Sequence, residues 1–207
     1  YSESKHSHHP GIEPMPDIAF INGRFLPWEE ATVSIDDRGF QFGDAVYEVI
    51  RTYRGTPFEF AAHLARLNRS VGELSLCQPY TKAQWTRWIQ QGLSLAGYQD
   101  AKIYIQVTRG VAPREHGFPT DTLPTVVMTI REFHPLTPDV RRTGVSACTR
   151  EDLRWGRCDI KSVNLLANVL AREEAKKAGV FETILVRDGF VMEGALSNVM
   201  AIQDGVV

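Results

Sequence analysis

Three side chains of this sequence could supply an amine, a cation and a carboxylate to one reaction centre. Lys161 lies in the segment RCDIKSVN, at the predicted start of a helix whose positive end disfavours a protonated amine. A lysine of this kind can attack a carbonyl compound and form a Schiff base. Arg66, in HLARL, offers the planar fork that suits a phosphate, and Glu193 could pair with a protonated pyridine nitrogen. Taken alone, each of the three is more often an ordinary surface residue.

Three further side chains could bind a substrate. Arg114 and His116 are two residues apart in a loop after a predicted strand, so both can point the same way and clamp a carboxylate. Tyr47 lies in a predicted strand, where its hydroxyl could bind substrate or cofactor, although core packing is the more common use. The surroundings of Ser197 do not form a nucleophile elbow, and the chain has no GxSxG, GxGxxG or Walker loop.

The pattern of apolar residues predicts the elements that would position these side chains. Asn22-Gly23 between apolar stretches is a strong hairpin signal, because both residues tolerate a positive φ. Apolar residues at three- and four-residue spacing predict an amphipathic helix over 61–76, which would carry Arg66. Thr81 is a suitable N-cap for a second helix. Strands are predicted at 46–53, 57–60, 101–108 and 125–130.

The later part of the chain has its own predicted elements. The segment HPLTPD, at 134–139, carries two prolines and is interpreted as an interdomain linker. A helix is predicted over 162–178, ended by Gly179, with an inner face made of Val163, Leu166, Leu170 and Ala171. Strands are predicted at 144–149, 183–186, 190–192 and 198–202. The predicted division is therefore a flexible tail over 1–16, a small α/β domain over 17–133, a linker over 134–139 and the first part of a larger domain over 140–207.

Composition excludes several classes of protein. The chain has 207 residues, a formal net charge of −2 and 43% hydrophobic residues, which is typical of a soluble globular protein. Nothing favours a nucleic-acid partner or a membrane, and no apolar run reaches the length of a transmembrane helix. The start of the chain does not resemble a signal peptide, and the three cysteines form no CxxC pair, so a cytoplasmic location is expected. His6, His8 and His9 could bind a metal, but a solvated tail is the simpler interpretation, and no metal site is predicted.

The motifs occur in an order that resembles the class IV, fold-type IV, pyridoxal-phosphate-dependent aminotransferases. The matching segments are DRGFQFGD at 37–44, VYEV at 46–49, HLARL at 63–67, QVTRG at 106–110, PREH at 113–116, RWGRCDIKS at 154–162, EG at 193–194 and SNV at 197–199. The resemblance covers about 18–207. Such an ordered set is far more specific than any one motif, and it favours the functional interpretation of each residue above.

The resemblance implies an α+β fold with a small α/β domain and a larger, mixed, β-rich domain that binds pyridoxal 5'-phosphate. It implies that Lys161 forms the Schiff base with the cofactor and transfers the substrate proton. Arg66 would bind the cofactor phosphate, Glu193 the pyridine nitrogen, and Ser197 would be a further cofactor contact. An amino acid and a 2-oxo acid would react in turn by a ping-pong mechanism.

Arg114 and His116 are similar to a pair that marks the D-amino-acid subgroup of the family. There such a pair holds the substrate α-carboxylate, together with the tyrosine that corresponds to Tyr47, and reaches across a dimer interface. The resemblance thus implies a homodimer with a shared active site, which moves an amino group between a D-alanine-like amino acid and a 2-oxoglutarate-like acid. Branched-chain aminotransferases and 4-amino-4-deoxychorismate lyases of the same fold remain alternatives, and an inactive fragment is a third.

The sequence departs from the family pattern at several positions. Ala45 stands where glycine is usual, and Ala195 and Leu196 replace hydroxyl-bearing residues that usually follow Glu-Gly in the D-amino-acid subgroup. These changes leave the finer substrate preference open. The chain stops at a turn followed by Val206 and Val207, which resembles the start of a strand. We therefore expect the 207 residues to be part of a longer native chain.

Overall fold

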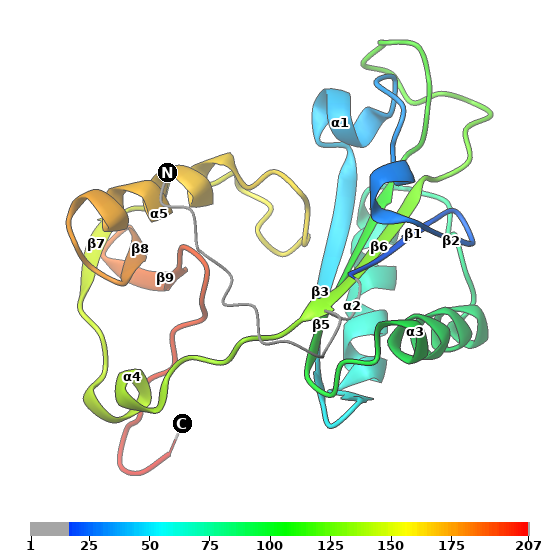
Figure 1. Ribbon diagram of the computed structural model, residues 1–207. Helices are drawn as coiled ribbons and strands as arrows, with labels where there is room; N and C mark the ends of the chain where they lie inside the picture. The colour runs from blue at the N-terminus through cyan, green and yellow to red at the C-terminus, as the bar shows by residue number, and fades with distance from the viewer. Residues whose placement is uncertain (1–16, 207) are drawn as a thin grey trace.

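A computed structural model describes residues 17–206, in which two β-sheets lie side by side and one segment connects them (Figure 1). The first sheet has six antiparallel strands in the order β2-β1-β6-β5-β3-β4. Its strands are β1 (Ile18–Ile21), β2 (Arg24–Leu26), β3 (Ala45–Tyr53), β4 (Thr56–Pro57), β5 (Ala101–Thr108) and β6 (Val126–Glu132). The helical segments of this half are η1 (Trp28–Glu30), α1 (Arg38–Phe42), α2 (Phe60–Glu73) and α3 (Lys82–Ala96).

The predicted hairpin is confirmed. Asn22 and Gly23 form the turn between β1 and β2 with φ angles of 48° and 88°. The side-chain oxygen of Asn22 accepts a hydrogen bond of 2.8 Å from the backbone N–H of Val126. The turn residue therefore also ties the hairpin to β6.

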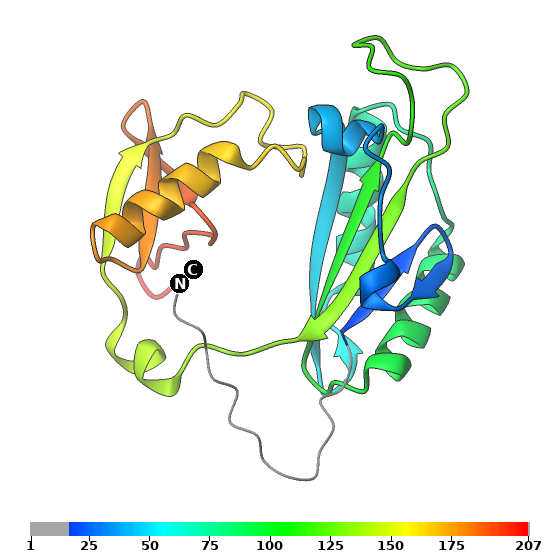
Figure 2. The same ribbon diagram turned by 45° about the horizontal axis from the view of Figure 1, so that its top comes forward.

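Helices α2 and α3 cover one face of the six-stranded sheet, and the other face looks toward the second half of the chain (Figure 2). The spacing that predicted α2 buries Leu64, Leu67 and Val71. The prediction for Thr81 is confirmed, because its hydroxyl accepts from the N–H of Gln84, and the side-chain oxygen of Gln84 accepts from the N–H of Thr81. The core between helices and sheet includes Phe20, Val46, Ile50, Trp85, Ile89, Ile103, Ile105, Met128 and Ile130.

The second half has a smaller sheet. Its strands are β7 (Ala147–Glu151), β8 (Glu182–Arg187) and β9 (Phe190–Gly194), in that order, with β7 parallel and β9 antiparallel to β8. The helices of this half are α4 (Pro138–Thr143) and α5 (Leu166–Lys177), and α5 packs against β8. The segment from Glu132 to α4 contains the predicted linker, although the division into domains stays a prediction. The predicted tail, with its three histidines, lies outside the described residues.

Four predictions for this half differ from the structure. Helix α5 begins at Leu166 rather than at residue 162, because residues 161–163 pair with the edge of β3 instead. Its buried face is made of Asn168, Ala171 and Ala175, whereas the leucines expected inside, Leu166 and Leu170, are 71% and 58% exposed. No strand forms over 198–202, and the strand expected from residue 144 begins at Ala147. The spacing of apolar residues did not show which face of α5 has side chains small enough to pack closely on the sheet.

Two features that other classes of protein have are absent from residues 17–206. No helix in this range combines the length and the apolar character that crossing a membrane requires. The same range contains no cluster of three or more histidine, cysteine, aspartate or glutamate side chains arranged to hold a metal ion.

Candidate active site

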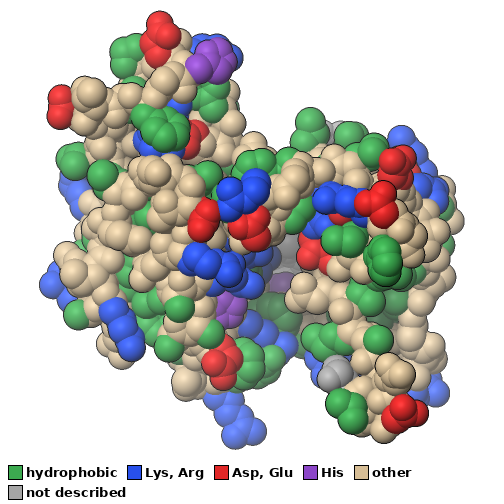
Figure 3. Space-filling view, turned by 180° about the vertical axis from the view of Figure 1, so that it is seen from behind, with side chains coloured by type: hydrophobic (Ala, Val, Ile, Leu, Met, Phe, Trp, Pro, Cys, Tyr) green, Lys and Arg blue, Asp and Glu red, His purple; other side chains and the backbone are tan. Residues whose placement is uncertain are grey.

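An open cleft of about 680 Å³ lies between the two halves. One wall comes from β3 and α2, and the other from the segment 154–165, the start of α5 and residues 193–198. Figure 3 shows the hollow between the halves, with basic side chains gathered at its mouth. Five of the seven residues proposed from the sequence line this cleft, namely Tyr47, Arg66, Lys161, Glu193 and Ser197.

The backbone around Lys161 extends the six-stranded sheet. The N–H of Tyr47 donates to the carbonyl of Lys161 at 2.9 Å, and the N–H of Val163 donates to the carbonyl of Ala45 at 3.1 Å. The N–H of Lys161 donates to the hydroxyl of the buried Ser70, on α2, at 3.3 Å. Lys161 thus belongs to the second half in sequence but is held by the first. The predicted position of Lys161 at a helix start is wrong, because the residue lies outside α5.

Lys161 reaches over an aromatic pair. Its Nζ lies 4.3 Å from the centre of the Tyr47 ring, and Tyr47 stacks on Tyr104 with 5.8 Å between the ring centres. The hydroxyl of Tyr104 donates to the side-chain oxygen of Gln106 at 2.6 Å, and burial raises the pKa of Tyr104 to about 12. Tyr104 is therefore a protonated, fixed support for Tyr47 at physiological pH.

Arg66 is aligned by a buried carboxylate. Glu48 on β3 is 1% exposed and accepts hydrogen bonds from Nε and Nη2 of Arg66 at 2.5 and 2.8 Å. His63 Nδ1 lies 2.8 Å from the same carboxylate. Burial alone would raise the pKa of Glu48, but the hydrogen bonds from Arg66 and His63 outweigh it and lower that pKa. Within residues 17–206, Nη1 of Arg66 has no partner, so it can donate to an anion in the cleft.

Glu193 is held by a second ion-pair network. It pairs with Nη1 of Arg154, whose Nε and Nη2 donate to Asp152 at 2.8 and 2.9 Å. Arg187 also contacts Asp152 at 2.9 Å. Hydrogen bonds from Arg154 lower the pKa of Asp152 to about 2, against an ordinary value of 3.8. The side chain of Glu193 is 39% exposed, so it is oriented by protein but still open to a ligand in the cleft.

Ser197 lies in a turn held by another carboxylate. Its hydroxyl donates to Glu182 at 2.8 Å, and its carbonyl accepts from the N–H of Gly194 at 2.7 Å. A Cβ on Gly194 would lie 2.4 Å from the hydroxyl of Ser197, so glycine is required for this close approach. The turn places Ser197 next to Glu193 at the wall of the cleft.

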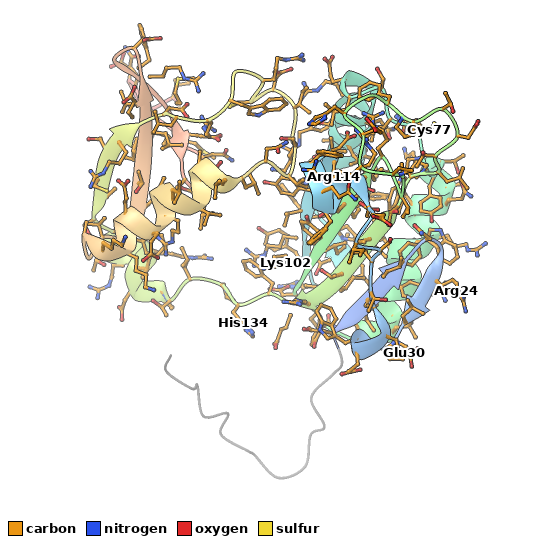
Figure 4. The ribbon with its side chains drawn as sticks, turned by 90° about the horizontal axis from the view of Figure 1, so that it is seen from above. Arg24, Glu30, Cys77, Lys102, Arg114 and His134 are labelled. Carbon is orange, nitrogen blue, oxygen red and sulfur yellow. The ribbon has the colours of Figure 1, made fainter. Side chains whose placement is uncertain are left out.

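Arg114 and His116 do not line the cleft of this chain. Both are exposed in the loop after β5, and Figure 4 shows Arg114 beside α1. The Arg114 guanidinium lies 4.9 Å from the centre of the Phe42 ring, and the His116 ring lies 5.3 Å from it. The structure therefore brings the two residues together on one aromatic ring, but separate from Lys161.

A family model described as amino-transferase class IV matches residues 45–207. The chain belongs to the class IV aminotransferases. Among curated relatives of this class IV aminotransferase, the D-alanine aminotransferase of Staphylococcus haemolyticus is 46% identical over 188 residues, which cover 91% of this chain and 67% of that protein. The match thus spans about two thirds of the curated relative.

Solved structures show the fold of this class IV aminotransferase. The branched-chain amino acid aminotransferase of Escherichia coli superimposes with a TM-score of 0.82 at 21% identity, covering 91% of this chain and 66% of that one. The PLP-bound form of a hypothetical aminotransferase from Mycobacterium tuberculosis gives a TM-score of 0.71 at 22% identity, covering 86% of this chain and 65% of that one. The fold-type IV prediction is confirmed.

The cleft of this class IV aminotransferase has the donor set that pyridoxal phosphate requires. The cofactor has an aldehyde, a phosphate and a ring nitrogen, which call for an amine, a cation and a carboxylate. Lys161, Arg66 and Glu193 supply one group of each kind to one cavity, and the side chains of Arg66 and Glu193 are 43% and 39% exposed. These residues fit the cofactor.

The sequence did not reveal what orients these groups. Glu48 and Arg154 are the partners of Arg66 and Glu193, and neither was assigned a role. A glutamate inside the otherwise apolar strand VYEVI was a usable signal, because a charge in a buried strand requires a partner. Arg154 gave no such signal in its polar segment.

Proposed function

We propose that this class IV aminotransferase uses pyridoxal phosphate to move an amino group between a D-alanine-like amino acid and a 2-oxoglutarate-like acid. The observation that carries the proposal is the convergence of Lys161, Arg66, Glu193 and Tyr47 on one cleft from widely separated parts of the sequence. The 46% identity to a D-alanine aminotransferase supports the choice of substrate class.

Pyridoxal phosphate, when bound, supplies an electron sink for the carbanion that deprotonation of an amino acid would leave. Arg66 would hold its phosphate, with the guanidinium kept in line by Glu48. Glu193 would hold its ring nitrogen, and Arg154 keeps that carboxylate oriented. Lys161 Nζ would take the proton from the substrate α-carbon and return it on the same side of the site.

We further propose that Arg114 and His116 bind the substrate carboxylate in the cleft of a second copy of the chain. In one chain they lie outside the cleft, although a cationic and a hydrogen-bonding side chain close together suit a carboxylate. A homodimer would bring the pair to the Tyr47 side of its partner's cleft.

The three free cysteines, Cys77, Cys148 and Cys158, agree with a reducing compartment, and we propose the cytoplasm.

The proposal is tested by loading the purified protein with pyridoxal phosphate and supplying D-alanine with 2-oxoglutarate. We expect pyruvate to form, with parallel double-reciprocal lines when both substrates are varied, because each product leaves before the next substrate binds. L-alanine should support a much lower kcat/KM.

Two outcomes would replace this proposal. Turnover of a branched L-amino acid without turnover of D-alanine would assign the protein to the branched-chain enzymes, with which it shares the fold. Pyruvate release from 4-amino-4-deoxychorismate without an acceptor acid would identify a lyase. If the visible absorption spectrum showed no bound cofactor, the proposal that this chain is an enzyme would be wrong.

A further inference from the structure

Arg38 is a buried cation that no step of the proposed reaction uses. It begins α1, is 3% exposed, and its Nε donates to Asp44 at 2.9 Å. Asp44 also accepts two hydrogen bonds from Arg109, at 2.7 and 3.0 Å. Two guanidinium groups thus share one carboxylate. A buried charge requires further hydrogen-bond acceptors, and those of Arg38 and Arg109 lie in different segments.

The remaining hydrogen bonds of Arg109 lie outside the loop that carries Arg114, although its guanidinium also packs on Phe118 of that loop, 3.6 Å from the ring centre. Its Nη1 and Nη2 donate to the carbonyls of Ser75 and Leu74, after α2, at 3.3 and 2.8 Å. This anchors the end of β5 to the helical layer and fixes Asp44. The position of the Asp44 carboxylate is therefore fixed. Because Asp44 binds only Nε of Arg38, the Nη1 and Nη2 atoms of Arg38 can donate to another segment.

The outer edge of Arg38 is directed at the Arg114–His116 loop. Nη1 donates to the carbonyl of Glu115 at 2.5 Å, and Nη2 donates to the carbonyl of His116 at 3.4 Å. Glu115 is the residue between the two side chains of the pair. The two carbonyl contacts of Arg38 therefore lie within that pair rather than at the base of the loop.

A shared aromatic ring reinforces the arrangement. The guanidinium of Arg38 lies 4.8 Å from the centre of the Phe42 ring, Arg114 lies 4.9 Å from it, and His116 packs against it at 5.3 Å. Phe42 ends α1, the helix that Arg38 begins. One short helix thus holds both the backbone and the side chains of the pair.

The geometry points to Arg38 as a positioning residue for substrate binding, which fixes the spacing of Arg114 and His116 and thereby sets the affinity for the substrate carboxylate. This inference rests on the proposed function, because it requires that the pair bind a carboxylate. Arg38 itself does not line the cleft. Its loss should therefore weaken substrate binding without changing the chemistry at Lys161.

The test is steady-state kinetics of the cofactor-loaded full chain with Arg38→Lys, which keeps the charge but removes the planar fork. We expect KM for both D-alanine and 2-oxoglutarate to rise about 10- to 100-fold, with kcat within about twofold, because small misplacements of a binding group cost that much. Cofactor absorption should not change. Phe42→Leu, which removes the aromatic ring at similar volume, should raise KM in the same way if the lysine variant folds poorly.

A matched control is Arg51→Lys. Arg51 also combines an ion pair with two aromatic contacts, to Asp100 and to Tyr53 and Phe133, but it lies elsewhere in the six-stranded sheet. We expect its KM values to stay within about twofold of those of the unmodified protein, because Arg51 neither lines the cleft nor contacts the Arg114–His116 loop.

The same substitution in a chain that lacks both Arg114 and His116 tests whether Arg38 acts through these two residues. In a chain that carries Arg114→Ala and His116→Ala, Arg38→Lys should cause no further rise in KM, because its route of action is gone. An equal rise in both backgrounds, or a fall in kcat with unchanged KM, would overturn the inference. If the double alanine variant has the KM of the unmodified protein, the proposal that Arg114 and His116 bind the substrate carboxylate is wrong. The inference about Arg38 is then wrong as well, because it depends on that proposal.

Discussion

The two halves of the chain bury their apolar residues to very different extents. The six-stranded half has one continuous core, in which Ile103, Ile105 and Trp85 are at most 1% exposed. In the half from Ala147 onward, the buried apolar cluster consists of Ala171, Leu185 and Ala195. The apolar side chains exposed there include Leu166, Val169, Leu170, Met200 and Ile202. The first half is therefore the better packed of the two halves that form the cleft.

Lys161 is held by the better-packed half. Lys161 follows the connecting segment in sequence, yet its backbone bonds to Tyr47 and Ser70 in the better-packed half. Arg66 is fixed there too, through Glu48. Glu193 and Ser197 come from the other half and are oriented by ion pairs and hydrogen bonds. The site thus joins groups anchored to the half with the large apolar core to groups anchored to the half whose apolar core is small.

The largest effect is expected at Lys161, where a substitution should abolish most of the activity and leave the stability almost unchanged. Lys161→Ala should lower kcat by on the order of 10³-fold or more, since both the amine and the proton transfer are lost. Its side chain is not part of the core, so the free energy of unfolding should change by less than about 0.5 kcal/mol. Kinetics and urea unfolding measure the two quantities.

Lys102→Ala is the control for that experiment. Lys102 is exposed on β5 of the same sheet (Figure 4), and we expect full activity from this variant. If Lys161→Ala kept more than a tenth of the kcat, the cleft would not be where the reaction occurs.

The second effect tests the difference in burial directly. Ile103→Ala should lower the free energy of unfolding by about 3 kcal/mol, because it leaves a cavity in a filled core. Leu170→Ala, on the exposed face of α5, should change it by no more than about 0.5 kcal/mol. Urea unfolding curves of the two variants, side by side, measure the contrast. An equal cost at Leu170 would mean that the outer face of α5 is covered in solution, and the contrast between the halves would disappear.

The sequence predicted elements well where local pattern decides them. The helix that carries Arg66 followed from apolar spacing, and the caps and turns at Thr81 and Asn22 followed from side-chain chemistry. The pairing of residues 161–163 with β3 did not, since a non-local hydrogen bond overrode the helix pattern that begins at 162. Local spacing cannot show such a contact.

The same limit applies to the site. Lys161, Arg66 and Glu193 were identified from motifs that stand in a specific order, and the structure places them in one cleft. Their partners Glu48 and Arg154 are 18 and 39 residues away from the groups they orient. Only the folded chain relates residues at such separations, so the ion pairs could not be read from the sequence.

The smallest of the three effects is the pH dependence of stability that Asp152 contributes in the half from Ala147 onward. The pKa of Asp152 is about 2 in the folded chain and ordinarily 3.8, so folding favours its ionised form. The stabilisation, about 2 kcal/mol, is therefore fully present above about pH 4 and is lost as the pH falls toward 2. Asp152→Asn should be less stable than the unmodified protein at pH 7 by about this amount, and the gap should narrow steadily below pH 4.

Urea unfolding at pH 7, 5 and 3.5 measures this gap, and Asp139→Asn provides the control. Asp139 pairs with Arg142 in the same half, but its side chain is 82% exposed, so solvent screens the pair and little change is expected at any pH. A gap for Asp152→Asn that stayed constant down to pH 3.5 would show that the residue contributes through packing rather than charge. In that case the ion pairs of Asp152 would not stabilise the half that carries Glu193, and that half would not differ from the first in depending on charge for its stability.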